Sequence, residues 1–133
     1  MKNMIIIDED RLNNLIAEAK ASPRLRMNFN LHDSLEAKAQ RLLNALEPGT
    51  VLPIHRHRHT AETYLLLKGK IKVKVYNEDK TLKETYLLAL SENNYGLHIP
   101  ANCWHTVEVI ESSVILEVKD GPYMPITEED ILK

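Results

Sequence analysis

The sequence predicts an all-β domain, an antiparallel sandwich or barrel preceded by a helical arm. Three observations lead to this prediction. Residues 69–76 alternate apolar and polar side chains, the pattern of a strand with one buried face. Further short segments rich in valine, isoleucine and leucine follow at regular spacing. Turn residues separate them, at Pro48-Gly49, Gly69, Gly96 and Pro100.

Residues 1–40 are expected to form an arm that packs on the rest of a single domain. Asp8 suits the start of a helix, because a short acidic side chain can accept a backbone N–H there. The apolar residues from 12 to 19 recur at helical spacing, and the helix should end before a proline. Residues 24–34 show no period, so we expect an irregular segment, then a short helical turn capped by Ser34.

Residues 41–133 are expected to form the barrel and a short acidic tail. Residues 41–46 suit a helix as well as a strand, and we interpret them as a strand because they lead into a Pro-Gly turn. Residues 69–76 and 81–90 are predicted to form a hairpin around a polar turn. Two more short strands are expected, one on either side of residues 111–113.

Composition narrows the class of protein. The 133 residues fit one ordinary domain, and 44% hydrophobic with 27% charged residues is typical of a soluble globular protein. The net charge of −2 argues against nucleic acid, and no apolar run is long enough for a membrane span or a signal peptide. One cysteine, Cys103, excludes an internal disulfide and fits a reducing compartment. We therefore expect a cytoplasmic protein without a nucleic-acid or membrane partner.

The main functional signal is a pair of histidines separated by one residue. Side chains alternate faces along a strand, so His55 and His57 are expected to point the same way. A turn after His57 can return Glu62 beside them, and His105 begins a later strand. We predict that these four side chains bind one divalent metal ion.

The donor set restricts the metal. Imidazole nitrogens with one carboxylate suit Fe, Mn, Zn, Ni or Co, whereas Mg and Ca prefer oxygen. Four protein ligands would leave about two open positions on an octahedral ion for a substrate or O₂. The alternatives are a solvated histidine pair and a basic anion-binding face made by the alternating histidines and arginines of residues 55–59.

The spacing of these residues resembles that of the cupin family. The first cupin motif is matched at its fixed positions by Gly49-x5-His55-x-His57-x4-Glu62-x6-Gly69. The second is matched in part by Gly96-x3-Pro100-x-Asn102-x2-His105. Here the Gly-to-Pro gap is shorter than in the family pattern, asparagine replaces a glycine, and Val109 stands in place of a later asparagine. Asparagine tolerates the left-handed conformation that such a turn needs. The resemblance implies a small cupin, a jelly-roll-like antiparallel β-barrel, and a homodimer.

Nearly the whole chain also resembles the WbuC-type cupin metalloproteins associated with bacterial O-antigen gene clusters. This resemblance is carried by residues 21–28, Leu31-His32, residues 40–49 and Gly121-Pro122-Tyr123. It implies a helical arm on a cupin barrel, a bound metal and a link to surface polysaccharide synthesis. It implies no particular reaction.

Candidate substrate-binding residues lie in the arm. Arg24 and Arg26 could hold a phosphate or carboxylate through bidentate hydrogen bonds, a role that the resemblance supports. Asn28 and His32 are predicted with them as substrate contacts, and the alternative is a solvated arm in which His32 is a loop residue.

Candidate catalytic residues are Glu62 and Tyr64. They are two residues apart on one predicted strand, so the tyrosine hydroxyl is expected to point into the barrel with the carboxylate. A buried tyrosine with a purely structural hydrogen bond is the alternative.

Two classes of function fit these features. The first is a metalloenzyme acting on a small polar molecule such as a sugar or sugar nucleotide, by isomerisation, epimerisation or oxygenation. The second is a non-catalytic module that holds or senses a glycan intermediate through the metal. A metal that only stabilises the fold would instead show closed coordination and a large loss of stability on chelation.

Overall fold

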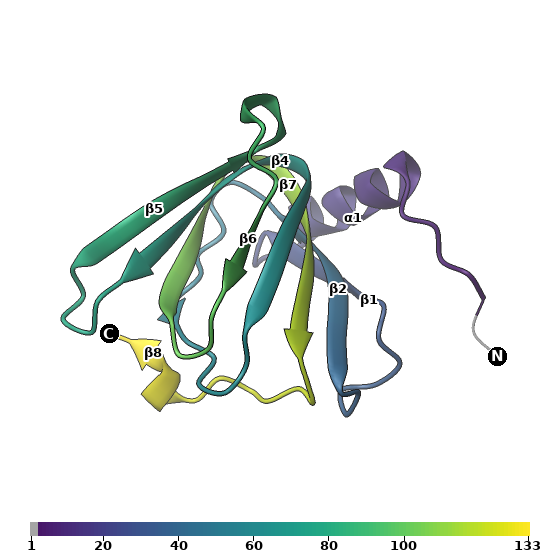
Figure 1. The fold of residues 1–133 in the computed structure, drawn as a ribbon. Helices are drawn as coiled ribbons and strands as arrows, with labels where there is room; N and C mark the ends of the chain where they lie inside the picture. The colour runs from purple at the N-terminus through teal and green to yellow at the C-terminus, as the bar shows by residue number, and fades with distance from the viewer. Residues whose placement is uncertain (1–2) are drawn as a thin grey trace.

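The structure is a computed structural model that describes residues 3–133, and it is mostly antiparallel β-sheet with one α-helix on its side (Figure 1). The elements in chain order are α1 (Glu9–Ala21), β1 (Arg26–Asn30), β2 (Ala39–Leu46), β3 (Ile54–His55), β4 (Glu62–Tyr76), β5 (Leu82–Ala89), the 3-10 turn η1 (Leu90–Glu92), β6 (Gly96–Ile99), β7 (Trp104–Asp120), the 3-10 turn η2 (Glu128–Asp130) and β8 (Ile131–Leu132).

The strands form two sheets that share β4 and β7. One sheet has the order β8-β3-β7-β4-β5 and uses residues 104–111 of β7 with residues 70–76 of β4. The other has the order β1-β2-β7-β4-β6 and uses residues 113–120 of β7 with residues 62–66 of β4. This arrangement confirms the predicted antiparallel β class and is consistent with a β-sandwich.

Both long strands bend where they pass from one sheet to the other. The register of β4 against β7 shifts between Leu66 and Ile71. Gly69 has a φ of +93°, and a Cβ on it would lie 2.2 Å from the Ser113 hydroxyl oxygen. That hydroxyl accepts from the Lys70 backbone N–H and donates to the Glu111 carbonyl. Only glycine fits where the two backbones approach so closely.

One prediction is wrong: two short strands were expected on either side of residues 111–113, but these residues do not separate two strands. β7 runs without interruption from Trp104 to Asp120. The polar residues at its middle mark a bend and not a turn, since Ser113 satisfies the backbone groups that the bend leaves unpaired.

A second correction concerns the arm. Residues 26–30 were expected to be irregular, but they form β1, which pairs with β2 from Arg26↔Leu46 to Asn30↔Leu42. The strand was missed because it has only five residues, and two apolar positions, Met27 and Phe29, are too few to establish alternation within an otherwise polar segment. The turn at Ser34 is closed by a hydrogen bond from the Ala37 N–H to the Ser34 carbonyl and forms no helix.

The remaining element predictions are confirmed. The Asp8 carboxylate accepts the Arg11 N–H at 3.0 Å and caps α1. The buried face of this helix packs on the outer face of the second sheet, and that cluster contains Leu12, Leu15, Ile16, Ala19, Leu43, Ala45 and Val114. Residues 41–46 lie within β2, and β4 and β5 form the predicted hairpin.

The space between the sheets is apolar over most of its length and polar at one end. The apolar part contains Leu46, Leu66, Ile71, Val73 and Ile115, all nearly inaccessible to solvent. The inner face of β4 carries Leu66 in the apolar part, Tyr64 next to it, and Glu62 at the polar end, where the strand begins. None of the helices within residues 3–133 has the length and apolar character needed to cross a membrane.

Candidate metal centre

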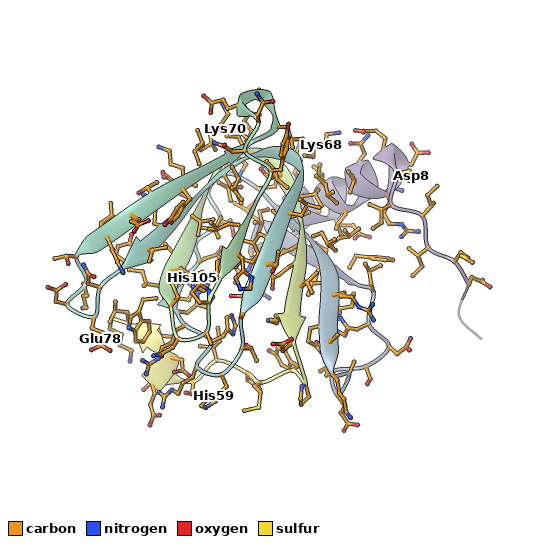
Figure 2. The ribbon with its side chains drawn as sticks, viewed as in Figure 1. Asp8, His59, Lys68, Lys70, Glu78 and His105 are labelled. Carbon is orange, nitrogen blue, oxygen red and sulfur yellow. The ribbon has the colours of Figure 1, made fainter. Side chains whose placement is uncertain are left out.

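Three strands bring three predicted metal ligands together at the polar end of the interior. His55 ends β3, Glu62 begins β4, and His105 lies second in β7, directly opposite His55 in register. One ligand atom from each lies within 4.8 Å of the other two. His105 lies inside the sandwich, whereas His59 lies on the loop at the outer end (Figure 2).

The two imidazoles are oriented by backbone carbonyls. The Nδ1 atom of His55 lies 3.0 Å from the Pro53 oxygen, and that of His105 lies 2.9 Å from the Cys103 oxygen. When Nδ1 donates to a carbonyl, Nε2 carries the free lone pair. This is the arrangement that a metal-binding histidine needs.

Glu62 supplies a buried oxygen between the rings. Its Oε1 atom lies 3.2 Å from Nε2 of both His57 and His105, and no described donor is aligned to give it a hydrogen bond. Burial acts to raise the pKa of Glu62, but the contact with His105 and the nearby histidine charges outweigh it and lower the pKa to about 2. A charged, unpartnered oxygen beside imidazole nitrogens fits a divalent cation.

The histidines differ in their tendency to accept a proton. Burial lowers the pKa of His55 to about 4 and also lowers that of His57. Burial acts in the same direction on His105, but the Glu62 carboxylate outweighs it and raises the pKa. At neutral pH His55 is therefore neutral, the form that binds a metal.

His57 was predicted to point the same way as His55 along one strand. The two rings do lie together, with centroids 5.2 Å apart, but β3 ends at His55 and His57 lies in the following loop. Its Nε2 atom contacts Glu62, but His57 is not part of the compact group of three. The Asn102 N–H donates to the His57 carbonyl at 2.8 Å. Asn102 has the expected left-handed conformation, with a φ of +67°.

Tyr64 points into the interior on the same face of β4 as Glu62, as predicted. Its hydroxyl is buried, 3.5 Å from both Glu62 Oε2 and His105 Nε2. Burial, reinforced by the charges of Glu62 and Glu117, raises the pKa of Tyr64 well above its ordinary value. The hydroxyl therefore stays protonated and can donate.

Sequence reasoning missed Glu117, a buried carboxyl directly opposite Tyr64 in register. Burial raises its pKa to about 7, and the charge of Glu62 acts in the same direction, while Lys119 lies 3.8 Å away and opposes them. The available signal was a carboxylate within the apolar run of residues 114–118, where a strand buried on both faces should carry none.

The four arm residues are not part of this cluster. The Arg26 guanidinium donates to the Thr50 hydroxyl and the Val51 carbonyl. Arg24 and Asn28 are exposed, and buried His32 accepts the Arg41 N–H at Nδ1. Among residues 3–133, the described contacts of these four side chains include no contact with the three clustered ligands.

A recess opens beside His57. Its volume is about 500 Å³, and its walls are the loop of residues 56–60 and the C-terminal segment of residues 120–130. We call it the C-terminal recess. Its volume lies within the roughly 300–1,000 Å³ typical of small-molecule sites.

Sequence comparison identifies a family without an assigned activity. The model of the family described as a domain of unknown function, DUF6016, matches residues 7–88. Among curated protein sequences, none matches this chain.

Structure comparison identifies the fold. The conserved protein SPY1581 of unknown function from Streptococcus pyogenes is 17% identical, with a TM-score of 0.64 and 93% of both chains covered. A cupin-2 domain-containing protein from Shewanella frigidimarina is 16% identical, with a TM-score of 0.55, covering 71% of this chain and 80% of that one. Oxalate oxidase with the substrate analogue glycolate is 14% identical, with a TM-score of 0.61, covering 80% and 56%. At such identities the shared property is the cupin fold.

Proposed function

This chain belongs to the DUF6016 family, and from its site we propose that it is a metal-binding cupin that acts as an enzyme on a small polar molecule. The observation that carries the proposal is the convergence of His55, Glu62 and His105 from three strands. Their ligand atoms lie within 4.8 Å of one another, and the carboxylate oxygen among them has no aligned donor.

The ligand set determines the chemistry that a metal would supply. A divalent Fe, Mn, Zn, Ni or Co ion held by these residues would supply Lewis-acid chemistry toward a carbonyl or hydroxyl oxygen of the substrate. His55 and His105 offer Nε2, and Glu62 offers Oε1. We propose His57 as the fourth ligand, because its Nε2 already lies 3.2 Å from that oxygen.

Two groups beside the ligands favour catalysis over simple binding. The Tyr64 hydroxyl, 3.5 Å from Glu62 and from His105, is a protonated donor within reach of a molecule at the metal. Glu117 is a buried carboxyl opposite Tyr64, and its pKa of about 7 suits proton transfer near neutral pH. Isomerisation, epimerisation and oxygenation are all compatible with these groups.

The finer parts of the proposal follow the resemblance of the sequence to WbuC-type proteins. We propose a sugar or sugar nucleotide as substrate, a role in surface polysaccharide synthesis, a cytoplasmic location, a homodimer and closure of the two sheets into a barrel. Arg24, Arg26, Asn28 and His32 remain proposed substrate contacts. Two of them, Arg24 and Asn28, are exposed and free to meet a ligand.

The test is the metal content of the untagged protein, measured by plasma mass spectrometry. We expect about one equivalent in the wild type and in His59→Ala, which removes an exposed histidine from the same loop. We expect little metal in His105→Ala and in His57→Ala. A wild-type protein that stays empty after reconstitution with each metal refutes the proposal.

Activity separates the enzyme from a binding module. Iron or manganese directs the assay to oxygen uptake, and zinc, nickel or cobalt to sugar isomerisation or epimerisation. A protein that holds one metal equivalent, binds sugar and turns over none of these substrates is the non-catalytic module.

A further inference from the structure

The C-terminal recess adjoins the metal centre at His57, which lines the recess and contacts Glu62. A smaller cavity of about 30 Å³ shares His57, Thr60, Asp120, Pro122 and Met124 with the recess and therefore adjoins it. The smaller cavity adds Lys119 and Tyr123 to the lining. A molecule in the recess would thus meet His57, whose Nε2 contacts Glu62, and Lys119, whose ammonium lies 3.8 Å from Glu117.

The two walls of the recess differ in chemistry. The C-terminal segment supplies an apolar wall of Pro122, Met124, Pro125 and Ile126. The loop of residues 56–60 supplies hydrogen-bonding side chains, of which His59 and Thr60 take part in no described side-chain hydrogen bond. Such a pair of walls suits a molecule with one apolar face and several oxygen atoms.

The arginines that line the recess are already paired with carboxylates. Arg56 Nε and Arg58 Nε donate to the same oxygen of Asp130, at 3.0 and 3.1 Å. Arg56 also stacks on Trp104, at 4.3 Å from the ring centroid, and Arg58 reaches Glu129 at 3.5 Å. A phosphate would compete with these carboxylates for the guanidinium donors and would be repelled by their negative charge and by that of Asp120, which also lines the recess.

The apolar wall is tied to the strand of a metal ligand. Ile131 pairs with His55 in the β8–β3 ladder, and the Arg56 N–H donates to the Asp130 carbonyl at 3.0 Å. The recess is therefore built onto the metal centre and is not an independent surface feature.

We propose that the C-terminal recess binds an uncharged molecule of monosaccharide size, with its oxygen atoms toward His57 and Lys119 and its apolar face against Met124 and Ile126. This inference rests on the proposed function, because it takes the recess as the entrance to the metal. Of the two substrate types proposed above, it favours an unphosphorylated sugar over a sugar nucleotide.

The test is a titration of the metal-loaded full chain, followed by isothermal calorimetry and saturation-transfer NMR. The probes are glucose, galactose and the 6-deoxy sugar rhamnose, with glucose 1-phosphate and glucose 6-phosphate as charged counterparts. We expect at least one free sugar to bind, and both phosphates to bind at least 10-fold more weakly. Tighter binding of a phosphate, or no binding of any free sugar, overturns the proposal.

Three variants locate the binding. Met124→Trp fills the recess from an exposed position, and Lys119→Met removes the ammonium from the adjoining cavity. Each should weaken sugar binding at least 10-fold. Met4→Trp is the matched control at a wholly exposed methionine and should bind like the wild type. Wild-type affinity in both recess variants overturns the assignment of the site.

The metal content of each sample keeps the two proposals separate. One metal equivalent without sugar binding refutes the recess alone. A wild-type protein that never loads metal but binds sugar in a Met124-dependent way refutes the metal function and retains the recess.

Discussion

Replacing Gly69 with alanine is expected to destabilise the fold strongly, because this position combines backbone strain with a steric clash. The φ of +93° lies in the region that residues with a Cβ avoid, which costs about 1–2 kcal/mol. A new Cβ would lie 2.2 Å from the Ser113 hydroxyl oxygen and 2.3 Å from the Ser112 carbonyl oxygen. Relieving such a contact with backbone costs about 1–3 kcal/mol more, so the expected loss is about 2–5 kcal/mol.

Gly49 provides the matched control for this prediction. Its φ of +95° gives the same strain, but the nearest atom to a new Cβ is the Leu25 Cδ1 atom, at 3.3 Å, in a side chain that can move. Gly49→Ala should therefore lose about 1–2 kcal/mol, from strain alone. The difference between the two variants isolates the clash at the bend.

Urea unfolding of the metal-free protein, followed by far-UV circular dichroism, measures both losses. The two free-energy losses can be compared if the slope of the unfolding free energy against urea concentration is the same in both variants and the wild type. Equal destabilisation by the two substitutions would refute the close contact between β4 and β7 at Gly69. It would also refute the argument that this contact lets each of the two strands belong to both sheets.

Three further predictions concern the helix, the core and the buried carboxyl. Asp8→Ala should lose about 1 kcal/mol of unfolding free energy by removing the cap of α1, against almost nothing for Asp10→Ala in the same assay. Leu43→Ala should lose about 2–5 kcal/mol, because this fully buried side chain lies between α1 and the second sheet; a smaller loss would mean that the helix is only loosely packed. The folded-state pKa of Glu117 is raised to about 7, so its contribution to stability is complete below about pH 4.5 and is lost as the pH rises through 7. The wild type should therefore lose stability across this range relative to Glu117→Gln, and parallel pH profiles of unfolding free energy would show that Glu117 is not buried.

Local patterns predicted the elements whose conformation depends on near neighbours. The helix from Glu9 to Ala21 follows from its cap and apolar period, and the β4–β5 hairpin from strict alternation and a polar turn. The left-handed Asn102 follows from the resemblance to the cupin motif, which has glycine at this position, and from the tolerance of asparagine for that conformation. Each of these depends on interactions over a few positions, which the linear sequence displays directly.

The candidate site was predictable to the extent that spacing constrains it. The intervals between His55, Glu62 and His105 indicated a common site, and the structure brings these three together. Strand alternation also predicted that His57 points the same way as His55, and the two rings lie 5.2 Å apart although β3 ends at His55. Alternation could not predict that His57 lies in a loop outside the compact group of three ligands, because the end of the strand depends on its pairing with distant segments.

By itself the sequence determined the β class, the N-terminal helix, and which residue types could bind a metal. Only the tertiary structure decided that β1 joins the sheet, that β7 is one bent strand, that Glu117 faces Tyr64, and that the C-terminal segment forms a wall beside the metal centre. These four features are pairings between segments far apart in the chain. Their register depends on which side chains can be buried together and on which backbone groups are still unpaired. Both depend on the whole folded chain and cannot be derived from a short stretch of sequence.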